Sequence, residues 1–260
     1  MRLVCLGTNG LHPNEDGQTA CYMIPELGIV LDAGSGLYRI SKYMQTSELD
    51  IYLTHSHTDH VIGLSDCLNG AIRKKIFIES DLRICDENMR IILDLVEEFL
   101  NRVRVYASEI TLGEVLKYPE LPDVNWCTME VKDLLPGDGV ITYFPLEHTI
   151  KCFGFRLDWP GHSLAYVTDT IARPESPYIE KIKGVDVLLH ECYMPDSLSN
   201  VSEQLGHSHT SAVAQVAAEA QVGRLVLIHH NTLGLKIGLA SACEIFPETE
   251  IGFDGMEIEF

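Results

Sequence analysis

The segment THSHTDH at residues 54–60 most limits what this chain can fold into, because it places four possible metal ligands within six positions. These are His55, His57, Asp59 and His60. Neutral imidazole and carboxylate are suitable ligands for zinc, manganese or iron. In an extended loop, His55 and His57 project to the same side, and a following turn would bring Asp59 and His60 to a second point. The alternative, a polar loop of solvated histidines, is disfavoured because the segment follows an apolar strand directly.

Three single residues stand where later apolar runs stop. His148 follows VITYFPLE, Asp169 follows LAYVT and His229 follows LVLI. Loops at strand ends converge beside a rigid sheet, so these residues could supply the ligands that one loop cannot. Taken singly, each could be a structural residue held by hydrogen bonds. Their shared context, a strand and then a ligand, favours metal binding for all three together.

The apolar pattern predicts two β-rich halves that each carry helices. Strands are expected at residues 2–6, 20–24, 28–31, 50–54, 75–78, 127–131, 140–144, 152–157, 164–168, 185–189 and 225–228. Helices are expected at residues 61–73, 81–100, 210–220 and 240–246. Since the chain has no repeat, low-complexity segment or Pro/Gly-rich linker, we expect one domain over residues 1–260. This pattern indicates the α+β class, with two sheets packed face to face and helices outside.

The acidity of the chain limits its partners. It carries 19 Lys and Arg against 38 Asp and Glu, a formal charge of −19. Such a surface repels polyanions, which argues against a broad grip on nucleic acid, although a small anionic substrate remains possible beside a metal. No apolar run is long enough to span a bilayer, so no membrane partner is expected. The eight cysteines include no CxxC pair and indicate buried free thiols, so we expect a cytoplasmic protein.

Together, the HxHxDH segment and the later His, Asp and His resemble the metallo-β-lactamase superfamily. The resemblance runs from LGTNG at residues 6–10 and LDAG at residues 31–34 to His229. It implies an αββα sandwich, in which two packed mixed β-sheets are flanked by helices and two metal ions lie at one edge. The implied ligands are His55, His57 and His148 for the first ion and Asp59, His60 and His229 for the second, with Asp169 bridging both. Asp32 is implied to be structural.

Within that superfamily, the nearest resemblance is to the ribonuclease Z-like phosphodiesterases. The matching segments are YVTDT at residues 166–170, VLLHECY at 187–193 and the stretch at 206–230. Aligned without gaps, the proton-donating histidine of the family falls on His207, with Glu191 holding its imidazole. His209 competes, because His-Thr-Ser-Ala also fits after a shift of two positions. In the same way, His230 is an adjacent rival of the ligand His229.

One departure from that group concerns tRNA. Ribonuclease Z enzymes carry a flexible arm that grips tRNA between the third-motif histidine and the bridging aspartate, whereas only 20 residues lie between His148 and Asp169 here. With the charge of −19, this makes tRNA an unfavourable partner. The short connection is more similar to members that cleave small or cyclic phosphodiesters, such as the phosphoribosyl cyclic phosphate phosphodiesterases.

The sequence therefore predicts a hydrolase with two divalent metal ions that cleaves a small or cyclic phosphodiester through a metal-bridging hydroxide. Zinc is favoured as the metal, with manganese and iron left open. The expected catalytic residues are His207, Glu191 and Asp59. The alternatives are a tRNA 3′-end endonuclease, a thioester or lactone hydrolase on the same fold, and a metal-binding scaffold without activity. Dimers are common in the resembled group, so we expect a homodimer.

Overall fold

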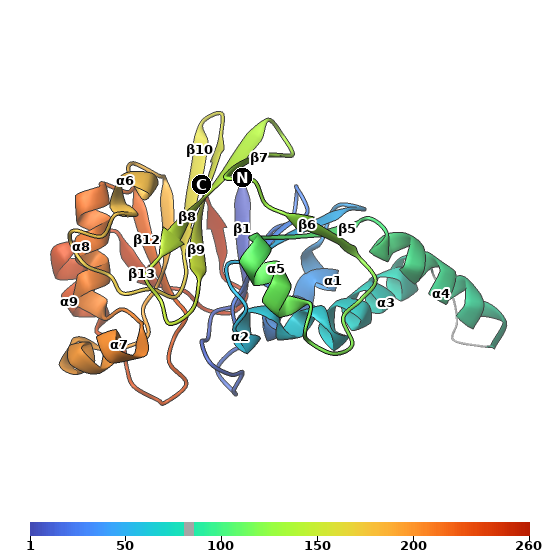
Figure 1. Cartoon of the computed structure of the whole chain (residues 1–260), viewed down its shortest axis with the longest axis horizontal. Helices are drawn as coiled ribbons and strands as arrows, with labels where there is room; N and C mark the ends of the chain where they lie inside the picture. The colour runs from blue at the N-terminus through green and yellow to red at the C-terminus, as the bar shows by residue number, and fades with distance from the viewer. Residues whose placement is uncertain (81–85) are drawn as a thin grey trace.

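In the computed structural model, which describes residues 1–80 and 86–260, two β-sheets pack between outer layers of helices (Figure 1). Each sheet has seven strands. This architecture is the expected αββα sandwich, so the predicted fold class is confirmed. The arrangement arises because each sheet is apolar on both faces and must bury one face on its partner and the other under helices.

The first sheet has the strand order β14-β1-β2-β3-β4-β5-β6. Its strands are β1 (Arg2–Gly7), β2 (Cys21–Ile24), β3 (Ile29–Leu31), β4 (Leu49–Tyr52), β5 (Val103–Ala107), β6 (Asn125–Thr128) and β14 (Glu257–Glu259). Strands β14, β1, β2 and β3 pair antiparallel, whereas β3 to β6 run parallel. Because β1 pairs with β14, the two ends of the chain meet in this sheet.

The second sheet has the strand order β13-β12-β11-β10-β9-β8-β7. Its strands are β7 (Lys132–Leu135), β8 (Gly139–Leu146), β9 (Cys152–Trp159), β10 (His162–Val167), β11 (Val187–Glu191), β12 (Arg224–Ile228) and β13 (Thr249–Ile251). The first half of this sheet is an antiparallel meander, and β10 to β13 run parallel. The carboxyl ends of β10, β11 and β12 therefore lie side by side at one edge.

The helices cover the outer faces of both sheets (Figure 1). Those over the first sheet or beside it are η1 (Ser35–Arg39), α1 (Ile40–Tyr43), α2 (Thr58–Val61), η2 (Ile62–Leu64), α3 (Asp66–Ser80), α4 (Asp86–Leu100) and α5 (Glu109–Val115). Those associated with the second sheet are α6 (Ile179–Ile182), η3 (Asp196–Leu198), α7 (Ser199–Leu205), α8 (Thr210–Ala220) and α9 (Leu239–Ile245). Helices α3 and α4 extend to the far end of the long axis.

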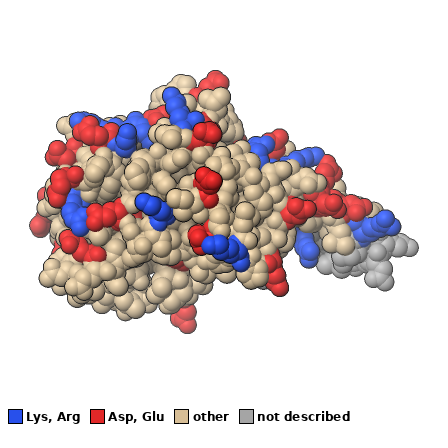
Figure 2. All heavy atoms as spheres, in the orientation of Figure 1, with Lys and Arg blue, Asp and Glu red and all other residues tan. Residues whose placement is uncertain are grey.

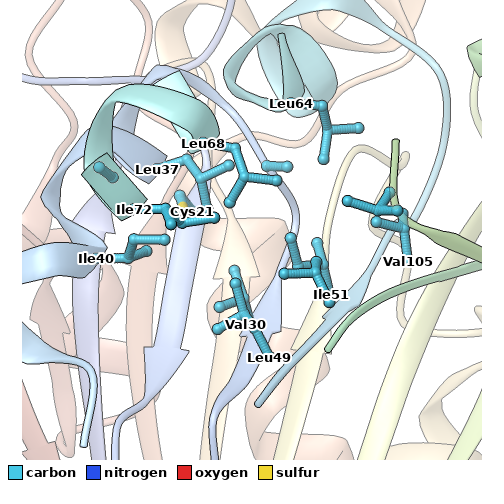
Figure 3. Packing of buried hydrophobic residues seen from close by; sticks show 14 of the residues in the cluster. Cys21, Val30, Leu37, Ile40, Leu49, Ile51, Leu64, Leu68, Ile72 and Val105 are labelled. Atoms are coloured by element: carbon cyan, nitrogen blue, oxygen red, sulfur yellow. The ribbon is translucent and has the colours of Figure 1, made fainter. Parts of the chain in front are cut away.

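Three apolar clusters correspond to the three interfaces between layers. The cluster between the sheets joins residues such as Leu31 and Tyr52 of the first sheet to Phe155 and Leu189 of the second. A second cluster packs the outer face of the first sheet against η1, α3 and α4, as Figure 3 shows around Val30. The third packs the second sheet against α6, α8 and α9. Burial of this apolar area is the main favourable contribution to folding.

One predicted strand was wrong, and the bounds of another differ from the structure. The strand expected at residues 75–78 lies inside α3 (Asp66–Ser80), because Leu68, Ile72 and Ile76 recur every four residues and face the core. The strand expected at residues 127–131 ends at Thr128, where the chain crosses from the first sheet to the second. Among the elements that the pattern also missed are β5, β7, β13, β14, α5 and α7. Part of the helix predicted at residues 81–100 is α4, and residues 81–85 lie outside the described part.

The connection between His148 and Asp169 contains only a β-hairpin. Strands β9 and β10 take up residues 152–167, and Trp159 pairs with His162 across a tight turn. The described structure therefore has no arm at this point, in agreement with the short spacing in the sequence. Among the described residues, no helix combines the length and apolar character that crossing a bilayer requires. Cys5, Cys21, Cys127, Cys152, Cys192 and Cys243 form no disulfide in the described part of the chain.

Replacing Phe155 tests the core between the sheets. Its side chain is fully buried beside the rings of Tyr52 and Tyr166. We expect Phe155→Ala to lower the free energy of unfolding by about 3–5 kcal/mol, because it removes apolar contacts and leaves a cavity. Urea unfolding measures this. The matched control is Phe253→Ala, whose side chain is 61% exposed and should change stability by less than about 0.5 kcal/mol. Equal effects would contradict the assignment of the core.

Candidate metal centre

The His-rich segment lies directly after β4 and is anchored by a buried aspartate. Asp32 accepts hydrogen bonds from the backbone N–H of Thr54 at 2.8 Å and from its hydroxyl. Helix α2 begins at Thr58, which places Asp59 and His60 in its first turn. The backbone is extended at His57, directly before the helix, so the chain turns after it, as the spacing predicts.

A first group of donor atoms comes from His55, His57, His148 and Asp169. The His57 Nδ1 atom lies 3.1 Å from His55 Nε2 and 3.2 Å from His148 Nε2. One carboxylate oxygen of Asp169, Oδ2, lies 3.6 Å from His55 Nε2 and 3.5 Å from His148 Nε2. Four ligands about 2.0–2.1 Å from a tetrahedral zinc ion would be separated by about 3.3–3.4 Å. These separations fit one cation.

A second group comes from Asp59, His60 and His229, together with the other oxygen of Asp169. The His229 Nε2 atom lies 3.2 Å from His60 Nε2, from Asp59 Oδ2 and from Asp169 Oδ1. The His60 Nε2 atom lies 3.3 Å from Asp169 Oδ1. Because the two oxygens of Asp169 face different donor groups, the arrangement fits two ions that share one carboxylate.

The fold explains why residues so distant in sequence meet here. Asp169 and His229 follow β10 and β12, and Glu191 ends β11 between them. His148 follows β8, which runs in the same direction as β10 because each is antiparallel to β9. All seven residues expected as ligands therefore lie at one edge of the two sheets, next to the His-rich loop.

In three of the histidines, the ring nitrogen that points away from the donor group forms a hydrogen bond. His60 Nδ1–H donates to Asp32 Oδ2 at 2.8 Å, and His148 Nδ1–H donates to the Gly206 carbonyl at 2.8 Å. The hydroxyl of Thr54 donates to Asp32 and lies 2.9 Å from His55 Nδ1. Such bonds fix the ring orientation and leave the other nitrogen free to bind a cation.

The electrostatics of the cluster also suit a cation. Burial lowers the pKa of His55, His57 and His148, which favours the neutral imidazole that binds metals. Burial acts to raise the pKa of Asp169, but the adjacent His229 and His60 outweigh it and lower that pKa. The carboxylates of Asp59 and Asp169 thus lie ionised and largely buried in one place, a charge distribution that needs positive charge for compensation.

A histidine–carboxylate pair lies beside the two donor groups. His207 Nδ1 is 3.5 Å from Glu191 Oε1, and a ring nitrogen of His207 belongs to a cluster with Asp169 and His229. Glu191 is fully buried and accepts hydrogen bonds from the backbone N–H groups of Thr170 and Ser208. Burial acts to lower the pKa of His207, but the charge of Glu191 outweighs it and raises that pKa to about 9.

The two rival histidines point to other partners. His209 Nδ1 lies 2.8 Å from Asp196 Oδ1 at the start of α8. His230 Nε2–H donates to the Gly252 carbonyl at 2.8 Å. Of the rivals His207 and His209, and of the neighbours His229 and His230, the first of each pair therefore faces the donor cluster. This is the register that the ungapped alignment expects.

Sequence reasoning missed two residues that shape this centre. A Cβ atom on Gly10 would lie only 2.4 Å from Cε1 of His229, so the imidazole occupies the space of the absent side chain. Tyr193 stacks on His207, with ring centroids 4.5 Å apart. The signal for Gly10 was present in the LGTNG segment, but its contact with His229 depends on tertiary structure.

A cavity of about 310 Å³ opens over the cluster. It is lined by Leu11, His57, Thr58, Asp59, His148, Thr149, Asp169, Tyr193, Leu205, His207 and His229. Residues of both donor groups therefore line a cavity that is large enough for a small molecule.

Comparisons with known proteins identify the relatives of this chain. A family model described as "Beta-lactamase superfamily domain" matches residues 29–230. A ribonuclease BN from Citrobacter koseri is 24% identical over 98% of both chains. The metallo-β-lactamase fold protein YhfI of Bacillus subtilis has a TM-score of 0.76 and 19% identity, covering 100% of this chain and 99% of its own. A diphosphatase of the PhnP family has a TM-score of 0.66 and 16% identity, covering 100% and 97% respectively.

Replacing Gly10 tests the placement of His229. We expect Gly10→Ala to displace the His229 ring and to reduce the bound metal from about two ions per chain to about one. Elemental analysis of dialysed protein measures this. The matched control is Gly113→Ala within α5, where an added Cβ meets nothing within 4 Å. Retention of both ions by Gly10→Ala would show that His229 is not needed for the second site.

Proposed function

Since this chain belongs to the β-lactamase superfamily and has the metallo-β-lactamase fold, we propose that it is a dinuclear metal-dependent phosphodiesterase for a small or cyclic phosphodiester. Members of this superfamily are generally metal-dependent hydrolases. The observation that carries the proposal is Asp169, whose two oxygens face separate donor groups next to the His207–Glu191 pair. This combination joins a site for two cations to a group that can donate a proton.

In this proposal His55, His57 and His148 hold one ion, and Asp59, His60 and His229 hold the other. Asp169 contributes one oxygen to each. Zinc is the favoured metal, because its ligand separations fit and imidazole and carboxylate suit it. When bound, two such ions supply positive charge for a phosphoryl oxygen and lower the pKa of a water molecule.

The chain itself supplies the proton for the leaving group. His207 lines the cavity, and the Glu191 carboxylate near its Nδ1 atom stabilises its protonated form. Bound cations act on the pKa of His207 in the opposite direction, because like charges repel. Glu191 is therefore needed to keep the imidazole protonated near neutral pH, where it can donate to an alkoxide.

The presence of a proton donor favours phosphodiesters over thioesters. A thiolate is a weakly basic leaving group and departs without a proton, whereas an alkoxide needs one. A cavity lined by His207 beside a buried Glu191 therefore supports cleavage of a bond to an alkoxide. Lactones also release an alkoxide, so a direct comparison of rates on a lactone and a phosphodiester must separate these two.

Three features of the chain support a small substrate: the short connection between His148 and Asp169, the comparison with ribonuclease BN, and the net charge. The hairpin of β9 and β10 takes the place of any arm between His148 and Asp169. The alignment with the ribonuclease BN relative is 333 positions long against 260 residues here, so that relative has residues without a counterpart in this chain. The charge of −19 also opposes binding of a polyanion.

The second candidate function is a ribonuclease, which the similarity to ribonuclease BN favours. An electrophoretic shift assay with precursor tRNA, followed by gel analysis of its 3′ end, separates the two. We expect neither a shift nor cleavage at micromolar protein and physiological salt. A trimmed 3′ end would overturn the small-substrate proposal.

Two neighbouring histidines provide the sharpest test of the proton donor. On a series of aryl methyl phosphates, we expect His207→Ala to reduce kcat by about 10²–10⁴-fold for the most basic leaving group and by less for p-nitrophenolate. His209→Ala, the matched control, removes a ring bound to Asp196 and should stay within about twofold of the parent. An equal loss across all leaving groups would assign His207 a structural role.

Replacement of Asp169 tests the metal requirement. We expect Asp169→Ala to lose both bound metal and hydrolysis of bis(p-nitrophenyl) phosphate, because the residue contributes to both donor groups. Removal of metal from the parent by a chelator should abolish the activity, and added zinc should restore it. A protein that holds two ions but leaves every diester intact would contradict the proposal. The homodimer and the cytoplasmic location stay predictions.

A further inference from the structure

We propose that the cavity over the metal centre selects phosphodiesters with a single negative charge and apolar substituents. This inference rests on the proposed function, because it concerns what the same cavity binds around the reacting phosphate. It differs from that proposal in naming the chemistry of the groups attached to the phosphate.

The first observation is the absence of basic side chains from the cavity wall. None of the described residues that line it is Lys or Arg. Arg173, which is close in sequence to Asp169, already forms an ion pair with Glu147 at 2.6 Å. In the view of Figure 2, the surface around α7, at the lower left of the molecule, carries few charged side chains. The wall therefore offers no guanidinium or ammonium group for a second phosphate or a carboxylate.

The second observation is Leu11, a large apolar side chain that is 58% exposed at the cavity. Its backbone has a φ of +67°, which a β-carbon makes unfavourable. The Leu11 N–H donates to Asp59 Oδ2 at 2.8 Å, and this bond needs only the backbone. Glycine would form the same bond without strain, so nothing in the fold requires leucine here. A role in contacting an apolar ligand would account for the side chain.

The third observation is that two more apolar surfaces line the same cavity from other parts of the chain. Leu205, the last residue of α7, is 45% exposed. Tyr193, which follows β11 and stacks on His207, also lines the cavity, but only 5% of its surface is exposed. The exposed apolar surface in the cavity is therefore supplied mainly by Leu11 and Leu205, and it gains free energy by covering apolar groups of a ligand.

Binding measurements on the metal-loaded protein test this without depending on turnover. The probes are three diesters with the same phosphate: diphenyl phosphate, dimethyl phosphate and bis(4-carboxyphenyl) phosphate. By isothermal titration calorimetry, we expect diphenyl phosphate to bind at least about tenfold more tightly than either of the others. Equal affinity for diphenyl and dimethyl phosphate would overturn the inference, as would tighter binding of the dicarboxylate.

Variants assign the preference to the named side chains. We expect Leu11→Gly and Leu205→Ala each to reduce the ratio of diphenyl to dimethyl affinity by at least about threefold. Leu11→Gly should unfold at an equal or higher urea concentration than the parent, because it relieves a left-handed leucine. The controls are Asp138→Gly, another left-handed position in the turn between β7 and β8, and Leu134→Ala, which is 84% exposed. Both should keep the parent ratio, and an equal drop in them would overturn the assignment.

The two proposals fail in different ways. If the protein holds two ions and keeps the selectivity for diphenyl phosphate but does not hydrolyse bis(p-nitrophenyl) phosphate, the phosphodiesterase proposal fails and the inference on ligand chemistry stands. If it hydrolyses diesters without any preference among the three probes, the phosphodiesterase proposal stands and this inference is wrong.

Discussion

The rest of the site depends on the buried carboxylate of Asp32, which connects the His-rich loop and α2 to the second sheet. It accepts hydrogen bonds from Thr54 at the start of the His-rich loop, from His60 in α2 and from Tyr166 in β10. The first two belong to the half of the chain that forms the first sheet, and Tyr166 belongs to the second sheet. One side chain thus sets the separation of the sheets at their shared edge and orients a donor of the second group. Because Asp32 is fully buried, its hydrogen bonds act in a medium of low dielectric constant.

Much of the architecture follows from local patterns. Alternating or continuous apolar runs indicated most strands. Of the strands that were missed, β7, β13 and β14 lie at sheet edges, whereas β5 lies inside the first sheet between β4 and β6. The wrong strand within α3 contains isoleucines that suit either structure, and only the spacing of Leu68, Ile72 and Ile76 along the core reveals a helix. The order of strands within each sheet depends on contacts between residues far apart in sequence, which no local pattern contains.

The residues of the donor groups could be predicted from the sequence better than the residues that pack around them. A ligand at the end of a strand is visible because its polar character interrupts an apolar run, as His148, Asp169 and His229 do. The role of Gly10 is different, because it consists of leaving space for a ring that lies more than two hundred residues away. Likewise, the sequence leaves His207 and His209 as rivals, and only the structure shows that their rings have different partners, Glu191 for His207 and Asp196 for His209.

Part of the backbone strain in this chain lies at the edge that carries the donor groups. Of the six non-glycine residues with positive φ in the described part, Leu11, Asp32 and His229 lie within or beside the cluster. Left-handed backbone at such residues costs free energy and persists only where other contacts fix it. At Asp32 and His229 those contacts involve the side chain, through hydrogen bonds to Asp32 and the proximity of the His229 ring to Asp59 and Asp169. At Leu11 they involve only the backbone N–H, so the leucine side chain remains available for contact with what enters the cavity.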